Sequence, residues 1–426
     1  MLVYFLLSMI FTTIMYPILP GVSGQASSQQ VINDSNLRVE VVFEGLDFPS
    51  SMAFLGPDDI LVLEKDKGTV HRIVNGQMLE RPLLDVGVAS KGERGMLGIA
   101  VVNADENDSE KSYIFLYYTE SPTNEDGVDD KLDEEPLGNR VYRYLLDDGQ
   151  LKDPKLLLDL PADTPKPIPF HNGGKVVIGP DQNVYTVIGD LDSRRTPTQN
   201  IEDGDEQDGT STIYRVNQEG DAAEGNPFAD IDGLSKYYAY GIRNSFGIDF
   251  DPVTGILWDT ENGPDHGDEI NLVEPGFNSG ALRIYGASTE EDKFDTDKLI
   301  EFDGKAKYSD PEFTWDVPIG VSDLRFLDSD KYGKEYENDL FVGDVNNGNI
   351  YRFDLNEKRT EFMLDEPLKD KIANDLEESN DVIFGKGFGG ITDIEVGPDG
   401  YLYVLAIKKF HEDNTGTIYR IVPASD

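Results

Sequence analysis

One stretch of the chain combines residue types that can carry out proton transfer. His171 begins a Gly-rich turn before a short apolar run at 176–178, and a second apolar run at 184–188 is followed by Gly189 and Asp190. A Gly-Pro-Asp-Gln turn joins the two runs, which predicts an antiparallel hairpin that brings Asp190 back beside His171. A carboxylate next to a histidine fixes the tautomer and stabilises the imidazolium, so this pair can act as a general base. A surface histidine near a turn aspartate is the alternative interpretation.

The composition limits the kinds of partner. The chain has 426 residues, with 82 Asp plus Glu against 37 Lys plus Arg and a formal net charge of −45. Such a charge excludes nucleic acids and anionic lipid surfaces as default partners. It indicates either a solvated acidic surface or the binding of divalent cations. The chain has no cysteine, which favours an exported protein that does not use disulfides.

The N-terminal segment also favours export. Residues 2–19 are almost wholly apolar and are followed by small and polar residues, which predicts a secretory signal peptide over residues 1–24. The apolar run is nearly long enough to span a bilayer, so an uncleaved N-terminal anchor is the alternative. We expect a linker over residues 25–36 and one domain over residues 37–426. The expected location is secreted or extracytoplasmic.

A repeating pattern runs through the rest of the chain. Each copy has an apolar strand, a turn, and a second strand that ends in an aromatic-basic or similar pair. The copies lie at 59–74, 113–144, 183–216, 255–273, 339–353 and 401–421. Their mean spacing of about 68 residues suits a four-stranded unit with long loops. No long amphipathic helical pattern competes, so the sequence predicts an all-β fold, a six-bladed β-propeller of four-stranded blades.

The two ends of the chain predict how the ring closes. The last copy supplies only about three strands, whereas a spare strand at residues 37–43 precedes the first copy. We expect this N-terminal strand to complete the last blade, so that strand pairing closes the ring. The loops at one end of a propeller channel converge, and segments that break the repeat are candidates for that end. These segments are 92–98, 170–175, 240–244, 261–269, 344–348 and 389–393.

Four segments carry the most specific patterns. In chain order they are Gly92-Glu-Arg-Gly-Met-Leu-Gly98, His171-Asn-Gly-Gly-Lys through Asp190, Tyr240-Gly-Ile-Arg-Asn-Ser-Phe-Gly247 and Glu261-Asn-Gly-Pro-Asp-His-Gly-Asp-Glu269. Together they resemble the soluble pyrroloquinoline-quinone (PQQ)-dependent sugar dehydrogenases, the glucose/sorbosone dehydrogenase family. The resemblance covers about residues 37–421. It implies a six-bladed propeller that oxidises a sugar.

The resemblance implies a role for each matching residue. His171 matches the base that takes the proton from the anomeric hydroxyl of the sugar while hydride passes to the quinone, and Asp190 matches its carboxylate partner. Arg243 matches a catalytic residue that also lies against the cofactor, where a guanidinium can stabilise the oxygens of the reduced quinone. Asn244 matches a further cofactor contact, and Glu93 falls at another cofactor-binding position.

The resemblance also implies calcium sites. Gly263 and Pro264 match the pair whose carbonyls hold the Ca²⁺ that grips the cofactor, where the ion polarises the carbonyl that receives hydride. Glu269 matches a ligand of a second, structural Ca²⁺. Ser279 stands where the family has a tyrosine, and a backbone ligand survives such a change. Carbonyl and carboxylate oxygens are the ligands that Ca²⁺ prefers.

The chain departs from the family where the cofactor is anchored. Asn346 takes the place of a lysine, Gly390 and Thr392 take the places of two arginines, and Asn262 replaces a glutamine. Each charge-assisted hydrogen bond contributes roughly 1.5–3 kcal/mol, so the loss of three cations weakens the binding of a cofactor with three carboxylates. Asn262, Asn346 and Thr392 are nevertheless the positions that should face PQQ.

Three functions are consistent with this sequence. The first is an extracytoplasmic quinoprotein that oxidises an aldose to its lactone with PQQ, Ca²⁺ and His171, and passes electrons to an unidentified acceptor. The second is a non-redox, calcium-stabilised propeller that binds carbohydrate or protein. The third is a calcium-dependent, lactonase-type hydrolase in which His171 activates water. Fold alone does not separate these chemistries. The sequence leaves the sugar and the oligomeric state open.

Overall fold

The computed structural model describes residues 30–104, 111–164, 166–192, 194–288, 296–408 and 414–424. The expected signal peptide or anchor, 1–24, lies outside these ranges, together with the first part of the expected linker. Helical segments in the described ranges are short, namely α1 (Val128–Lys131), η1 (Pro197–Gln199), η2 (Thr296–Lys298), η3 (Leu368–Asp370) and η4 (Glu378–Val382). None of the helices in these ranges has the length and apolar character needed to cross a membrane.

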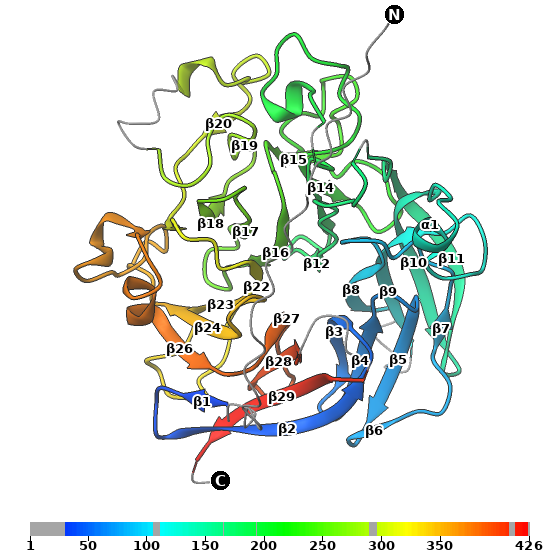
Figure 1. The fold of residues 1–426 in the computed structure, drawn as a ribbon, viewed down its shortest axis with the longest axis vertical. Coiled ribbons are helices and arrows are strands. Elements are labelled where there is room, and N and C mark those ends of the chain that lie inside the picture. The colour runs from blue at the N-terminus through cyan, green and yellow to red at the C-terminus, as the bar shows by residue number, and fades with distance from the viewer. Residues whose placement is uncertain are drawn as a thin grey trace, which may run out of the picture.

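The described strands form six sheets arranged around a common centre, which makes the fold an all-β propeller (Figure 1). Each sheet is named here by its innermost strand. The β3 sheet contains β3 (Pro49–Gly56), β4 (Asp59–Glu64), β5 (Thr69–Val74), β6 (Gln77–Met78) and β7 (Leu84–Asp85). The β8 sheet contains β8 (Met96–Asn103), β9 (Ser112–Glu120), β10 (Gly138–Asp147) and β11 (Gln150–Leu160). The β12 sheet contains β12 (Val176–Ile178), β13 (Val184–Ile188), β14 (Thr212–Val216), β15 (Tyr237–Tyr240), β19 (Phe277–Asn278) and β20 (Lys307–Tyr308).

The remaining three sheets complete the set. The β16 sheet contains β16 (Ser245–Phe250), β17 (Leu257–Glu261), β18 (Asp268–Val273), β21 (Phe313–Trp315) and β25 (Ile372–Ala373). The β22 sheet contains β22 (Val321–Phe326), β23 (Leu340–Asp344), β24 (Asn349–Phe353), β26 (Ile383–Lys386) and β1 (Val31–Ile32). The β27 sheet contains β27 (Gly390–Val396), β28 (Leu402–Ile407), β29 (Gly416–Pro423) and β2 (Leu37–Leu46).

Apolar side chains fill the space between neighbouring sheets. Each of six buried clusters joins two of them, through pairs such as Leu61 and Leu116, Phe115 and Val184, Tyr185 and Ile248, Trp258 and Leu324, Phe341 and Val404, and Val62 and Leu405. A sheet covered on both faces needs continuous apolar runs rather than alternation. The strands β13 and β28 are accordingly buried at every position.

The innermost strands meet around the centre of the ring. They contact one another in the order β3, β8, β12, β16, β22, β27 and back to β3. Near one end of the ring, Ser50 Oγ on β3 donates to the carbonyl of Met96 at the start of β8 at 2.6 Å, and Nδ2 of Asn262, just after β17, donates to the carbonyl of Val321 at the start of β22 at 2.8 Å. The loops that precede these strands therefore converge, and this convergence positions the candidate site.

The N-terminal strand closes the ring as predicted. Strand β2 pairs with β29 in antiparallel register from Leu37 opposite Pro423 to Leu46 opposite Gly416. Val31 and Ile32, which fall inside the expected linker, pair as β1 with β26. Each predicted copy of the repeat falls on the second and third strands of one sheet. Several sheets have more than four strands, because two-residue strands such as β19, β20 and β25 extend their outer edges.

Candidate functional site

His171 and Asp190 meet at the channel end of the β12–β13 hairpin. The pairing of Val176 with Thr186 sets the register, and His171 Nδ1 lies 2.5 Å from Asp190 Oδ1. Both side chains are buried, and the N–H of Asp192 also donates to Asp190 Oδ1 at 2.8 Å. Among the described residues no hydrogen bond is made by His171 Nε2. The predicted placement is confirmed, and the geometry leaves one ring nitrogen for a ligand.

Glu93 reaches the same hairpin from the loop before β8. Its Oε2 accepts the backbone N–H of His171 at 2.5 Å and that of Asn172 at 3.3 Å. The amide of Asn244 donates to Glu93 Oε1 at 3.3 Å. Burial raises the pKa of Glu93, while the nearby His171 and these donors oppose the rise. Three loops that are distant in sequence therefore meet around one carboxylate.

Arg243 connects the histidine hairpin to the loop after β17. Its carbonyl accepts the N–H of Asp190 at 2.9 Å. Its guanidinium Nη1 donates to the carbonyls of Asn262 at 2.6 Å and Gly263 at 3.0 Å, and its own N–H donates to Glu261 Oε1 at 2.9 Å. The predicted residues Arg243, Asn262 and Gly263 are thus in direct contact. Their carbonyl oxygens form a polar rim beside the His171–Asp190 pair.

Two buried side chains at this rim have unpaired polar atoms. Asn244 Oδ1 and Asn172 Nδ2 have no hydrogen-bond partner among the described residues. Both residues are buried, with relative exposures of 4% and 0%. An unpaired buried donor or acceptor costs about 1–3 kcal/mol unless a ligand or water pairs with it. Asn244, whose amide faces Glu93, is therefore suited to contact a polar ligand, whereas the Asn172 side chain faces Asn139 of β10.

Three buried carboxylates lie together next to this rim. Glu261 on β17 is paired in register with Glu269 on β18, and Asp259 is two residues before Glu261 on the same face. Ser279 Oγ donates to Glu261 Oε2 at 2.8 Å, and the N–H of Gly286 donates to Glu269. Neither carboxylate oxygen of Asp259 has a partner among the described residues.

The electrostatics of these three groups reflect their burial. Desolvation raises the pKa of Glu261 to about 7, with Asp190 adding to the rise, and it raises the pKa of Asp259 and Glu269 well above the usual range. Buried carboxylates without a counter-ion favour a bound cation. Within the described ranges, however, no three His, Cys, Asp or Glu side chains converge closely enough to enclose a metal ion.

The remaining predicted positions have uncharged side chains. Pro264 and Asn346 are exposed, and Thr392 is an extra residue in the bulge of β27, where its Oγ1 donates to the Leu405 carbonyl at 3.3 Å. Gly390 lies at the start of β27. In the described ranges no hydrogen bond joins Asn346, Gly390 or Thr392 to the His171 group. The structure therefore places no cation at these three anchor positions.

Between the innermost strands is an ionic cluster that the sequence patterns did not predict. Lys175 Nζ lies 2.9 Å from Asp323 Oδ2, 2.5 Å from Asp393 Oδ1 and 3.5 Å from Glu395 Oε1. Arg325 pairs with Asp249 and Glu395 just beside it. Lys175 is the last residue of the His171 motif, and Asp393 is the last residue of the 389–393 segment. The sequence signal that could have indicated this cluster is a charged residue within or directly before an apolar strand.

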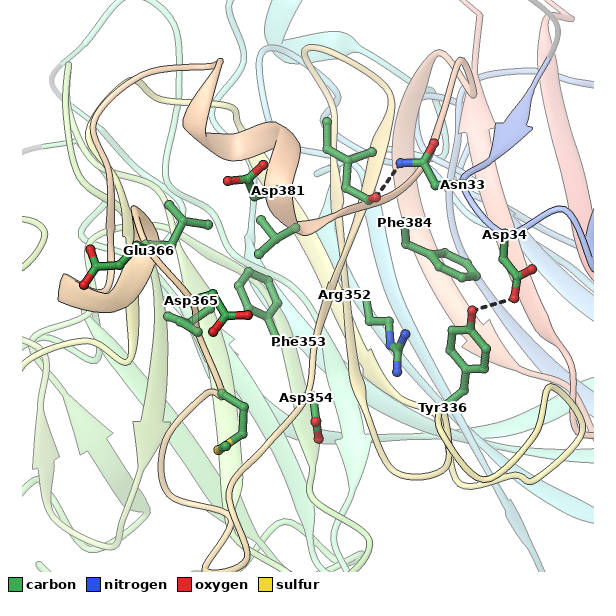
Figure 2. Close-up of a pocket in the computed structure, with 15 residues that line it drawn as sticks. Asn33, Asp34, Tyr336, Arg352, Phe353, Asp354, Asp365, Glu366, Asp381 and Phe384 are labelled. Carbon is green, nitrogen blue, oxygen red and sulfur yellow. Dashed lines mark hydrogen bonds between the residues drawn. The ribbon is translucent and has the colours of Figure 1, made fainter.

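A separate cleft of about 640 Å³ lies on the outer side of the β22 sheet. Figure 2 shows Asp34, Arg352, Asp365 and Asp381 around it, with Phe353 on its wall. None of the residues predicted for the site lines this cleft. It is therefore distinct from the channel end.

The chain is similar to known sugar dehydrogenases over most of its length. A model of the family described as Glucose / Sorbosone dehydrogenase matches residues 46–420. Aldose sugar dehydrogenase YliI of Escherichia coli (strain K12) is 28% identical over 397 residues, covering 91% of this chain and 94% of that protein. Quinoprotein glucose dehydrogenase B of Acinetobacter calcoaceticus is 28% identical over 289 residues, covering 63% of this chain and 56% of that protein.

Solved structures show the same fold. The apo form of the soluble aldose sugar dehydrogenase of Escherichia coli superposes with a TM-score of 0.66 at 23% identity, covering 91% of this chain and 99% of that chain. The PQQ-bound aldose sugar dehydrogenase of Streptomyces coelicolor superposes with a TM-score of 0.66 at 22% identity, again covering 91% and 99%.

Proposed function

Because the chain belongs to the glucose/sorbosone dehydrogenase family, a family of sugar oxidoreductases, we propose that it oxidises the anomeric carbon of an aldose to the lactone. The observation that carries this proposal is the buried contact of 2.5 Å between His171 Nδ1 and Asp190 Oδ1. With Nδ1–H held by the carboxylate, Nε2 is available to take the hydroxyl proton of the sugar. Asp190 then stabilises the imidazolium that results.

PQQ is the cofactor proposed for the reaction, and when bound it accepts the hydride. The unpaired Asn244 Oδ1 fits a polar ligand at the rim, and Arg243 supplies a cationic group there. Arg243, Asn244 and Asn262 are the residues proposed to surround it. The uncharged positions Asn346, Gly390 and Thr392 support a lower affinity than a fully cationic site would give.

Calcium is the second group proposed, on the basis of the chemistry of the oxygen atoms present. The carbonyls of Gly263 and Pro264 would hold an ion beside the cofactor. Glu269 and the backbone near Ser279 would hold a second ion, where the unpaired oxygens of Asp259 and the opposed Glu261 and Glu269 support cation binding. Calcium held there would polarise the quinone carbonyl that accepts hydride.

The number of propeller blades and the cellular location of the enzyme are part of the same proposal. Each of the six sheets is taken as one blade of a six-bladed ring over residues 37–426, with β2 completing the last blade. Residues 1–24 are proposed as a signal peptide or anchor that places the enzyme outside the cytoplasm. A separate electron acceptor would reoxidise the cofactor.

The test is titration of the mature domain with PQQ in millimolar Ca²⁺, followed by absorbance and by intrinsic fluorescence. Saturable binding that is lost with a chelator, and bleaching of the bound cofactor by an aldose, would support the dehydrogenase. Absence of PQQ binding at tens of micromolar would overturn the quinoprotein proposal. If PQQ does not bind, hydrolysis of a lactone would support the lactonase-type hydrolase instead, and binding of a glycan would support the non-redox propeller.

A further inference from the structure

His171 has an unusual backbone conformation. Its φ of 62° lies in the left-handed region, which few residues other than glycine adopt without a local cause. Asp190 contacts the ring and does not hold the backbone. A second group must therefore stabilise the turn for the imidazole to have a fixed position.

Glu93 is the group that contacts this backbone. Its Oε2 accepts the N–H groups of His171 and Asn172, at 2.5 Å and 3.3 Å. Its own N–H donates to the Pro169 carbonyl at 3.0 Å, so the loop before β8 and the turn before β12 bind each other in both directions. Gly92 permits this approach, because a Cβ there would lie 2.4 Å from the Pro169 carbonyl oxygen.

The hydrogen bonds of Glu93 point to positioning rather than to cofactor contact. One carboxylate oxygen is occupied by two backbone donors, and the other faces the Asn244 amide at 3.3 Å. We propose that Glu93 is a positioning residue, whose carboxylate holds the His171 backbone in the left-handed conformation and so fixes the imidazole. This inference rests on the proposed function, in which His171 is the base.

Three variants separate positioning from other roles. Glu93→Ala removes the acceptor of both N–H groups. Glu93→Gln keeps an acceptor, because its amide oxygen can face His171 while the Asn244 amide turns and its unpaired Oδ1 accepts from the new amide. Glu64→Ala is the matched control, because Glu64 is a buried glutamate that accepts the Asp47 N–H at 2.8 Å and lies 3.3 Å from His71.

The first measurement is hydrogen exchange of the peptide that contains residues 171 and 172, without cofactor. Glu93→Ala should expose about two additional amides, whereas Glu93→Gln and Glu64→Ala should leave that peptide protected. This readout does not need PQQ, so it decides the positioning role even where the proposed function fails. Unchanged exchange in Glu93→Ala overturns the inference.

The second measurement uses the PQQ-loaded enzyme with an aldose. Glu93→Ala should lower kcat about 10²-fold and leave PQQ affinity within about threefold, because a misplaced base loses rate and not cofactor binding. Glu93→Gln should recover most of the lost kcat. A large loss of PQQ affinity in Glu93→Ala, or a Glu93→Gln variant as slow as Glu93→Ala, would assign the carboxylate a direct role and overturn the inference.

Discussion

His171 Nδ1 and Asp190 Oδ1 are 2.5 Å apart, although 19 positions separate the two residues in sequence. The hairpin of β12 and β13 explains this contact, because its two ends lie side by side. Gly173 allows the turn to pass close to the second strand, since a Cβ there would lie 2.5 Å from the Val187 carbonyl oxygen. The pair is buried, so its mutual orientation does not depend on exposed side chains.

Removal of either member should therefore abolish turnover and spare binding. We expect His171→Ala and Asp190→Asn to lower kcat about 10²–10⁴-fold, because the first removes the proposed base and the second no longer holds the Nδ1–H tautomer. PQQ affinity, measured by fluorescence titration, should stay close to that of the wild type. The control is His266→Ala, since His266 also lies beside an aspartate, Asp265, but at an exposed position. Equal losses in all three variants would contradict the assignment.

The hairpin and the repeat could be predicted because each depends on a local pattern, and the ring closure could be predicted because the last copy lacks a strand while the N-terminus has a spare one. The Gly-Pro-Asp-Gln turn between apolar runs is enough to place Asp190 beside His171. Contacts across the channel have no such pattern. Lys175 pairs with Asp323 and Asp393, which are 148 and 218 positions away, and the orientation of a charged side chain inside a buried channel is decided by tertiary packing.

The role of Glu93 is a second feature that sequence could not supply. The resemblance placed it among the cofactor contacts, whereas the structure shows its carboxylate bound to the backbone of His171 and Asn172. The type of a residue does not show whether its side chain accepts hydrogen bonds from a distant backbone segment. The left-handed φ of His171 is equally invisible, because sequence rules expect glycine or asparagine there.

Lys175 should be essential for stability. It is 5% exposed and is bound to Asp323, Asp393 and Glu395, so its removal leaves the buried carboxylates of Asp323 and Asp393 without their counter-charge, whereas Glu395 keeps Arg325. We expect Lys175→Met to lower the free energy of unfolding by about 3–5 kcal/mol, measured by urea denaturation. Lys152→Met is the control, because Lys152 makes a half-exposed pair with Asp147 and should cost less than about 1 kcal/mol. Similar losses in the two variants would show that the channel cluster is not a buried network.

Asp344 should make stability depend on pH. Burial raises its pKa to about 6, although its carboxylate accepts the N–H groups of Asn347 and Gly348 and the hydroxyl of Tyr351. A carboxyl with a raised folded-state pKa stabilises the protein below its unfolded pKa, and this contribution is lost as pH rises through about 6. The loss between about pH 5 and pH 7.5 should be roughly 1 kcal/mol.

Asp344→Asn removes this titration and tests it. The variant should gain roughly 1 kcal/mol relative to the wild type when pH rises from about 5 to about 7.5, measured by urea denaturation at both values. Asp354→Asn, at an exposed aspartate, should show no such gain. A relative loss in Asp344→Asn over the same interval would mean that the three donors, and not burial, dominate this carboxyl.

Calcium should stabilise the fold through the opposed carboxylates of Glu261 and Glu269. The two residues are directly paired on neighbouring strands, and Asp259 adds two unpaired oxygens nearby. A cation bound only by the folded state raises the free energy of unfolding, by about 2.7 kcal/mol at a hundredfold excess over Kd. Thermal unfolding should therefore shift upward when Ca²⁺ is added to chelator-treated protein.

The Glu269→Gln variant should be at least as stable as the wild type without Ca²⁺ and less stable than the wild type with Ca²⁺. Without Ca²⁺ the variant replaces a buried carboxyl whose ionisation is disfavoured by burial, so it should be at least as stable as the wild type. With Ca²⁺ it lacks a ligand and should gain less than the wild type gains. Glu274→Gln, at the exposed position just after β18, should keep the full gain. If Glu269 has only a structural role, the variant should be less stable than the wild type both with and without Ca²⁺. A variant that is at least as stable as the wild type without Ca²⁺ but less stable with Ca²⁺ would identify Glu269 as a calcium ligand.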